Sequence, residues 1–142
     1  MPRCLALLIV PLLAASVIAP AVGAPLAPAL RAAARLRDAA AALEARTDAA
    51  LAGRGAWPAG GVEGVNLALL HAERALLGPG LPGRTWFRHE LYAPGLNTGY
   101  AAVSLPRLGQ AVLDAEPRAW AQGVEPVARA LDAAASSLAG VK

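Results

Sequence analysis

Residues 25–52 read PLAPALRAAARLRDAAAALEARTDAALA, with no glycine or proline after Pro28. Alanine has the highest helix propensity, so this stretch predicts one long helix. Apolar residues recur along it at seven-residue intervals, namely Ala29, Leu36, Leu43 and Ala50. That spacing places them in one stripe on a helix, with the charged side chains outside it. The narrow stripe predicts that another helix packs closely against this face.

A second helix is predicted over 62–77, because its apolar residues step by three and four positions. They are Val62, Val65, Leu69, Ala72 and Leu76. Clusters of glycine and proline at 53–61 and 78–80 bound this helix. His71 falls just off the apolar stripe, where we expect an exposed or partly buried histidine without a ligand role.

Two further helices are predicted towards the end of the sequence. Pro106 suits the first turn of the third helix, with Ser104 near its cap, and Pro117 begins the fourth. The apolar stripe of the fourth helix is Trp120, Val124, Val127, Leu131, Ala134 and Leu138. Pro126 lies inside it and predicts a bend near Gly123, unless the helix begins later.

Residues 81–104 connect the second and third helices and contain Trp86, Phe87, Tyr92 and Tyr100 among several glycines and prolines. A connection of this length is usually functional. Its aromatic side chains either cap one end of the helices or face a partner. The whole pattern shows four amphipathic helices and no alternating strands. It therefore predicts an all-α fold, an up-and-down bundle of four main helices with a long aromatic-rich loop.

Composition and motifs exclude several classes of function. The 13 basic residues, nearly all Arg, exceed the 10 acidic ones by only three and lie among them, so no nucleic-acid binding is expected. A single cysteine excludes a disulfide framework and a cysteine-based metal site within one chain. The usual catalytic and phosphate-binding motifs are absent from the sequence. We therefore predict no catalytic residue, no metal and no cofactor for this chain.

The N-terminal segment 1–24 allows two interpretations. Residues 4–19 carry no charge, follow Arg3 and precede the small residues 22–24, which is the pattern of a secretory signal peptide. The run is short for a membrane span and is interrupted by Pro11. The alternative is a buried apolar segment of the folded domain. A signal peptide would make the protein secreted, and membrane association is left open.

The sequence resembles a known family over about residues 14–140. The stretch 73–94, ERALLGPGLPGRTWFRHELYAP, is followed by NTGYA at 97–101 and SLP at 104–106. These motifs closely resemble the transferrin receptor-like dimerisation domain, the C-terminal helical domain of glutamate carboxypeptidase and its relatives. Members of that family pair largely through this domain, and their zinc ligands lie in a separate protease-like domain.

The resemblance implies roles for particular residues. Tyr100 matches a substrate-pocket tyrosine of the family, while Gly99 stands where glutamate-specific members carry a lysine. The loss of that cation argues against recognition of an acidic C-terminal residue. Arg88, His89, Tyr92 and Pro94 match structural or interface motifs of the family. Residues 1–20 would then be the remnant of a preceding protease-like domain.

These observations predict a non-catalytic, homodimeric helical domain over residues 25–142. One alternative is the C-terminal part of a zinc-dependent carboxypeptidase, which completes the substrate pocket of a separately encoded or missing catalytic domain. Another is a secreted helical adaptor that binds an unrelated protein through the aromatic loop.

Overall fold

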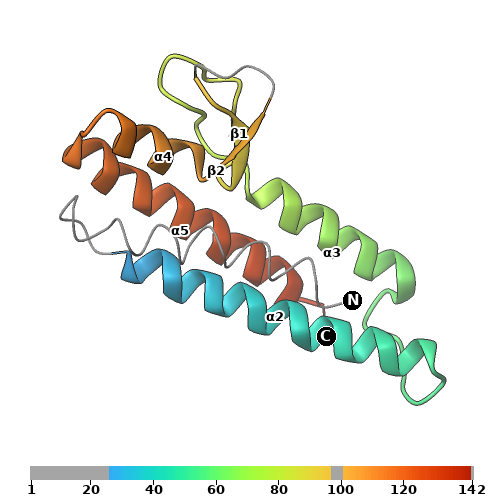
Figure 1. Cartoon of the computed structure of the whole chain (residues 1–142). Helices are drawn as coiled ribbons and strands as arrows, with labels where there is room; N and C mark the ends of the chain where they lie inside the picture. Colours follow the sequence, from blue (N-terminus) through green and yellow to red (C-terminus); the bar gives the residue numbers. More distant parts are fainter. Residues whose placement is uncertain (1–25, 97–100, 142) are drawn as a thin grey trace.

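The computed structural model describes residues 26–96 and 101–141, and these residues are mostly helical, as predicted (Figure 1). The helices are α2 (Ala27–Leu51), α3 (Gly61–Ala75), α4 (Pro106–Leu113) and α5 (Pro117–Ala139), and the strands are β1 (Tyr92–Pro94) and β2 (Ala102–Ser104). The N-terminal segment 1–24, with its two interpretations, lies outside the described residues. Within the described part of the chain, no helix is long and apolar enough to cross a membrane.

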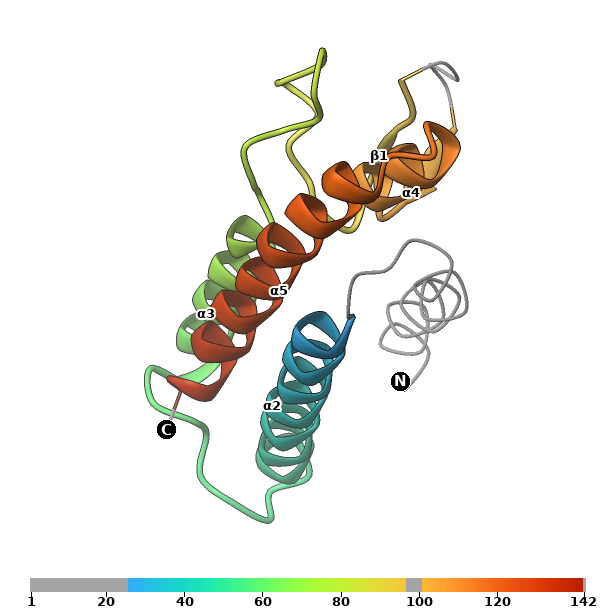
Figure 2. The same cartoon turned by 90° about the vertical axis from the view of Figure 1, so that its left-hand side faces the viewer.

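Helix α5 is the centre of the fold, because α2, α3 and α4 all pack against it. Figure 2 shows α2 and α3 on different sides of α5, with α3 along the C-terminal part of α5 and α4 near its beginning. The buried side chains of α5 include Trp120, Val127, Leu131 and Leu138, all members of the predicted stripe. A broad apolar face of one helix therefore organises the core.

The predicted up-and-down order of four helices is corrected by this arrangement. In such an order the first and fourth helices run in opposite directions. Figure 1 shows α2 and α5 running in the same direction instead. The physical reason is the segment between α3 and α4, which projects away from the helices and does not reverse the chain direction as a short helix connection would.

The packing of α2 on α5 follows the predicted alanine-rich stripe. Ala29 and Ala32 are fully buried, and Leu36 and Leu43 are also in the core. Ala50, at the end of the predicted stripe, is half-buried. Small side chains at the contact let the two helix backbones approach closely. At the edge of the contact, Nε and Nη2 of Arg35 donate to Oδ1 of Asp132 at 2.8 and 2.5 Å.

Helix α5 runs without interruption from Pro117 to Ala139, so the predicted start is confirmed and the later start is wrong. Gly123 lies where α4 crosses it. A Cβ atom at Gly123 would stand 2.8 Å from Leu108 Cδ2 and 3.2 Å from Arg107 Cδ. The missing side chain therefore lets α4 pack directly on the α5 backbone, and this close contact fixes the beginning of α4.

The connection between α3 and α4 contains an antiparallel hairpin, which corrects the prediction of a loop without strands. Residue Tyr92 pairs with Ser104, Ala93 with Val103 and Pro94 with Ala102. Strands of three residues are too short to show a readable alternation of apolar and polar residues. After β2, Leu105 takes a positive φ of 48° and Pro106 occupies the first turn of α4, as predicted. Ser104 makes no side-chain capping bond there.

Candidate functional site: the loop junction and the outer face of α3

His89 connects the loop to the hairpin that follows it. Its Nδ1 atom accepts hydrogen bonds from the backbone N–H groups of Leu91 at 3.2 Å and Tyr92 at 3.3 Å. The ring proton therefore belongs on Nε2. That atom lies 3.2 Å from Oε1 of Glu73, within ion-pair distance but without hydrogen-bond geometry. These two bonds fix the backbone at the start of β1.

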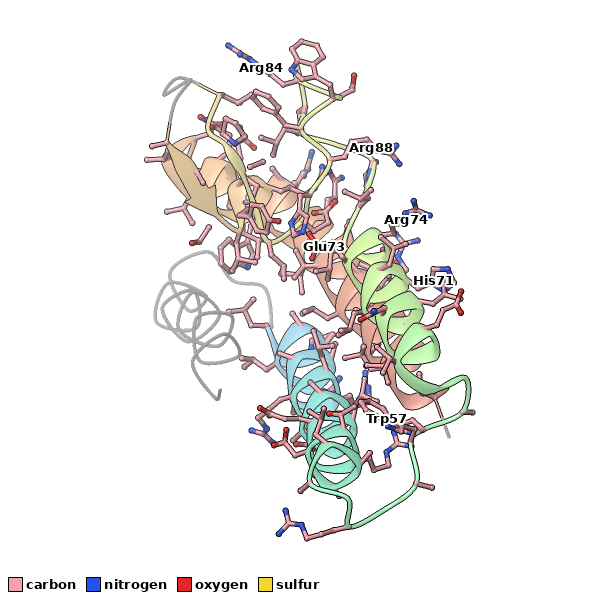
Figure 3. The ribbon with its side chains drawn as sticks, turned by 90° about the vertical axis from the view of Figure 1, so that its right-hand side faces the viewer. Trp57, His71, Glu73, Arg74, Arg84 and Arg88 are labelled. Carbon is pink, nitrogen blue, oxygen red and sulfur yellow. The ribbon has the colours of Figure 1, made fainter. Side chains whose placement is uncertain are left out.

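Tyr92 links β1 to the end of α3. Its hydroxyl donates to Oε1 of Glu73 at 3.0 Å, and its ring stacks on His89 with the centroids 3.9 Å apart. The hydrogen bond to Glu73 raises the pKa of Tyr92, and burial and the negative charge of the carboxylate act in the same direction. Figure 3 shows Glu73 directed from α3 towards the base of the loop. The Glu73 carboxylate thus binds Tyr92 and lies beside His89, and these three side chains form the loop junction.

A buried ion pair lies beside this junction. Glu90 is only 3% exposed, and its Oε2 atom is 3.5 Å from Nε of Arg107, the second residue of α4. Arg107 also donates from Nη2 to the carbonyl oxygen of Gly80. The other oxygen, Glu90 Oε1, has no hydrogen-bond partner within the described residues. It occupies the space above Gly78, where any Cβ atom would collide with it. Arg107 therefore ties Gly80 and Glu90, which stand on either side of the loop tip, to α4.

The remaining predicted site residues have separate positions. Arg88 is exposed, and its Nε donates to the carbonyl oxygen of Gly78 at 3.1 Å. Pro94 belongs to β1, opposite Ala102. Tyr100 and Gly99 lie outside the described residues. The structure thus brings together His89 and Tyr92, and it adds Glu73, Glu90 and Arg107, which the sequence did not indicate as site residues.

Trp86 and Phe87 lie at the tip of the loop, and Trp86 is exposed there. Trp86 is 67% exposed and packs edge-to-face on Phe87, with the ring centroids 5.9 Å apart. Arg84 lies over the Phe87 ring at 5.7 Å and donates to the carbonyl oxygen of Leu96 at 3.0 Å. Figure 3 shows Arg84 at the far end of the loop, away from the helices. Trp86 therefore does not cover the end of the helices.

The buried face of α3 differs from its predicted stripe. Val65, Ala72 and Leu76 are buried as expected, together with Ala68. Val62 and Leu69 were expected to be buried, but both are about half exposed. On the outer side of the helix, Leu67 and Leu70 are 50% and 45% exposed, and Leu77, just after the helix, is 44% exposed. His71 is exposed beside them, and Figure 3 shows it pointing away from α5. Helix α3 thus presents aliphatic side chains to solvent as well as to α5.

Within residues 26–96 and 101–141, no three His, Cys, Asp or Glu side chains are grouped so that they could hold a metal ion. The carboxylates of the junction are instead paired within the protein, Glu73 with Tyr92 and Glu90 with Arg107. These contacts tie the loop to α3 and α4.

These features define a small helical domain that exposes an aliphatic helix face and a firmly attached loop. Residues 25–139 match the family model described as the transferrin receptor-like dimerisation domain. The match covers most of the chain, so the chain belongs to this family, as the resemblance indicated.

Two curated relatives carry the same kind of sequence. A probable glutamate carboxypeptidase of Arthroderma benhamiae is 50% identical over 54 residues, which is 38% of this chain and 7% of the relative. The inactive zinc metalloprotease C354.09c of Schizosaccharomyces pombe is 35% identical over 74 residues, 51% of this chain and 9% of the relative. The chain thus matches less than a tenth of the length of either relative.

Proposed function

We propose that this chain is a non-catalytic homodimerisation domain, formed by residues 25–142, whose second copy covers the outer face of α3. The observation that carries the proposal is the set of half-exposed leucines on that helix, in a chain that belongs to a dimerisation-domain family. Removing aliphatic surface from water contributes about 25 cal/mol per Å², offset by the cost of association.

The oligomeric state of the purified chain tests this proposal. We expect light scattering coupled to size-exclusion chromatography to report the mass of a dimer at micromolar concentration. Leu70→Asp places a charge in the middle of the proposed interface and is expected to shift the equilibrium towards monomer. Leu113→Asp, at a side chain that is 79% exposed on α4, is the matched control. A strict monomer at roughly 50 μM, a concentration that detects even weak self-association, would overturn the proposal.

A second candidate function is supported by the names of the relatives. One is a probable glutamate carboxypeptidase, and the other is an inactive zinc metalloprotease. We propose as the alternative that the chain completes the substrate pocket of a zinc carboxypeptidase domain supplied separately, with Tyr100 at the substrate. Tyr100→Phe is then expected to lower the affinity of the assembled peptidase for its substrate. An unchanged rate and affinity would remove this role.

The segment 1–24 is assigned to neither function, and its nature is tested by the N-terminus of the protein from its natural source. We propose that it lies outside the dimerisation domain. Sequencing that begins at Ala24 or Pro25 is expected if the segment is a signal peptide, whereas an intact Met1 is expected if it is the remnant of a preceding domain.

A further inference from the structure

The exposed face of α3 carries a regular stripe that the core does not use. Its members are Glu63, Leu67, Leu70 and Arg74, separated in turn by four, three and four positions. Alternating steps of four and three residues keep side chains on one line of a helix, and this is the spacing of a coiled-coil seam. All four side chains are exposed, although two of them are leucines. A solvated seam of this kind is incomplete without a second helix.

The two charged members lie at opposite ends of α3. Glu63 is in the first turn and Arg74 in the last turn. Neither side chain makes an ion pair or a hydrogen bond within residues 26–96 and 101–141. Figure 3 shows Arg74 directed away from α5. The stripe therefore ends in a free negative charge on one side and a free positive charge on the other.

We infer that two copies of α3 pair antiparallel across a two-fold axis that passes between Ala68 and Leu69. Glu63 and Arg74 are equally far from this point in sequence, and so are Leu67 and Leu70. The axis therefore places Glu63 beside the partner's Arg74, twice, and Leu67 beside the partner's Leu70, twice. This inference rests on the proposed homodimer and names the surface and register that form it.

The charges select this orientation. A parallel pair would bring the two Glu63 side chains together and the two Arg74 side chains together, which is repulsive in both places. The antiparallel pair also sets the dipoles of the two helices in opposition, which is favourable. The stripe is thus complementary to itself in one direction only.

Charge exchange tests the register in the full chain. Glu63→Arg and Arg74→Glu, each made alone, are expected to raise the dimer dissociation constant about tenfold, because each change turns two attractions into two repulsions. The double variant E63R/R74E restores both attractions, and its dissociation constant should return close to that of the parent. Glu125→Arg on the exposed face of α5 is the matched control and should leave dimerisation unchanged.

The double variant also separates the seam from a simple effect on helix stability. Each reversal opposes the α3 dipole, so a helix effect would add in the double variant and weaken the dimer further. Circular dichroism verifies that each variant keeps its helix content. If neither single reversal changes the dimer dissociation constant, the α3 seam is overturned and the homodimer stands. A monomeric parent would overturn the proposed function itself.

A distance measurement provides a second readout. With Cys4→Ser as background, a spin label at Val62→Cys reports the separation of the two α3 N-terminal ends. The antiparallel register separates the two positions by about 20 Å along the axis, since a helix rises about 1.5 Å per residue. Parallel packing would bring them within about 10 Å, the usual distance between packed helices. The shorter distance would contradict the inference.

Discussion

At the scale of single residues, Glu73 is the anchor of the loop junction. One of its oxygens accepts the hydrogen bond of Tyr92 and lies next to His89. Only the protonated form of Tyr92 can donate this bond, and this is why the bond raises its pKa above the ordinary value of 10.0. A raised pKa means that the stabilisation is complete below the unfolded pKa and is lost as the pH rises through the folded pKa.

We therefore expect the parent protein to lose more stability than Tyr92→Phe as the pH rises above about 10, the ordinary range for a tyrosine. At neutral pH, Tyr92→Phe should lower the free energy of unfolding by at most about 1 kcal/mol, because a half-exposed hydrogen bond contributes little. Thermal unfolding of both proteins between neutral and strongly alkaline pH measures the difference in stability between them. All other titratable groups are the same in the two proteins, so their contributions cancel in this difference. Parallel curves for the two proteins would contradict the expectation.

The buried pair of Glu90 and Arg107 allows a second test. Arg107→Met leaves the Glu90 carboxylate buried without a cation, so we expect a loss of about 3 kcal/mol in the free energy of unfolding. Adding Glu90→Gln removes the stranded charge and should recover part of that loss. Denaturant unfolding of the two single variants and the double variant gives the coupling between the residues. Additive losses would show that the pair does not act as a unit.

The sequence identified part of this site and not the rest. His89 and Tyr92 stood out because they lie in an aromatic segment with family-like motifs. Glu73 could not be found in this way, because it looks like an ordinary surface residue of a helix and meets Tyr92 only after the chain folds back over 19 residues. Arg107 and Glu90 likewise meet only in the folded protein, because they are 17 residues apart in the sequence.

At the scale of helices and strands, proline and glycine made the helix boundaries readable. Pro106 and Pro117 begin α4 and α5, and the Gly78-Pro79-Gly80 cluster follows α3. The buried face of α3 was harder to predict. Apolar residues surround most of that helix, so its pattern suits more than one stripe. Only the packing against α5 decides that Ala68 is buried and Leu69 is half exposed. The short hairpin gave no readable pattern at all.

Two glycines lead to opposite expectations: Gly123, at the contact of α5 with α4, and Gly109, on α4 next to β2. Gly123→Ala gains helix propensity of about 1 kcal/mol. It also forces a methyl group against Leu108, and overpacking of this kind costs about 1–3 kcal/mol, so the variant should be less stable. At Gly109 a Cβ atom would stand 3.8 Å from Val103 Cγ1, an ordinary contact.

Gly109→Ala should therefore be as stable as the parent or more stable. Thermal unfolding compares the two alanine variants directly. Equal effects at both glycines would mean that α4 does not rest on the α5 backbone as closely as described.

At the scale of the whole molecule, a dimer links stability to protein concentration. If unfolding separates two copies, the apparent melting temperature must rise as the protein is concentrated. We expect this rise for the parent and for E63R/R74E, and a much smaller one for Leu70→Asp. Calorimetry over a hundredfold range of concentration measures it. A melting temperature independent of concentration in the parent would indicate that folding does not depend on association.

The central position of α5 has a consequence for how the protein is made. This helix is the last of the described helices to leave the ribosome, yet each of the earlier ones packs against it. Until α5 emerges, the apolar faces of α2 and α3 have no helix to pack against. The core of the domain can therefore form only late, after α5 has emerged from the ribosome.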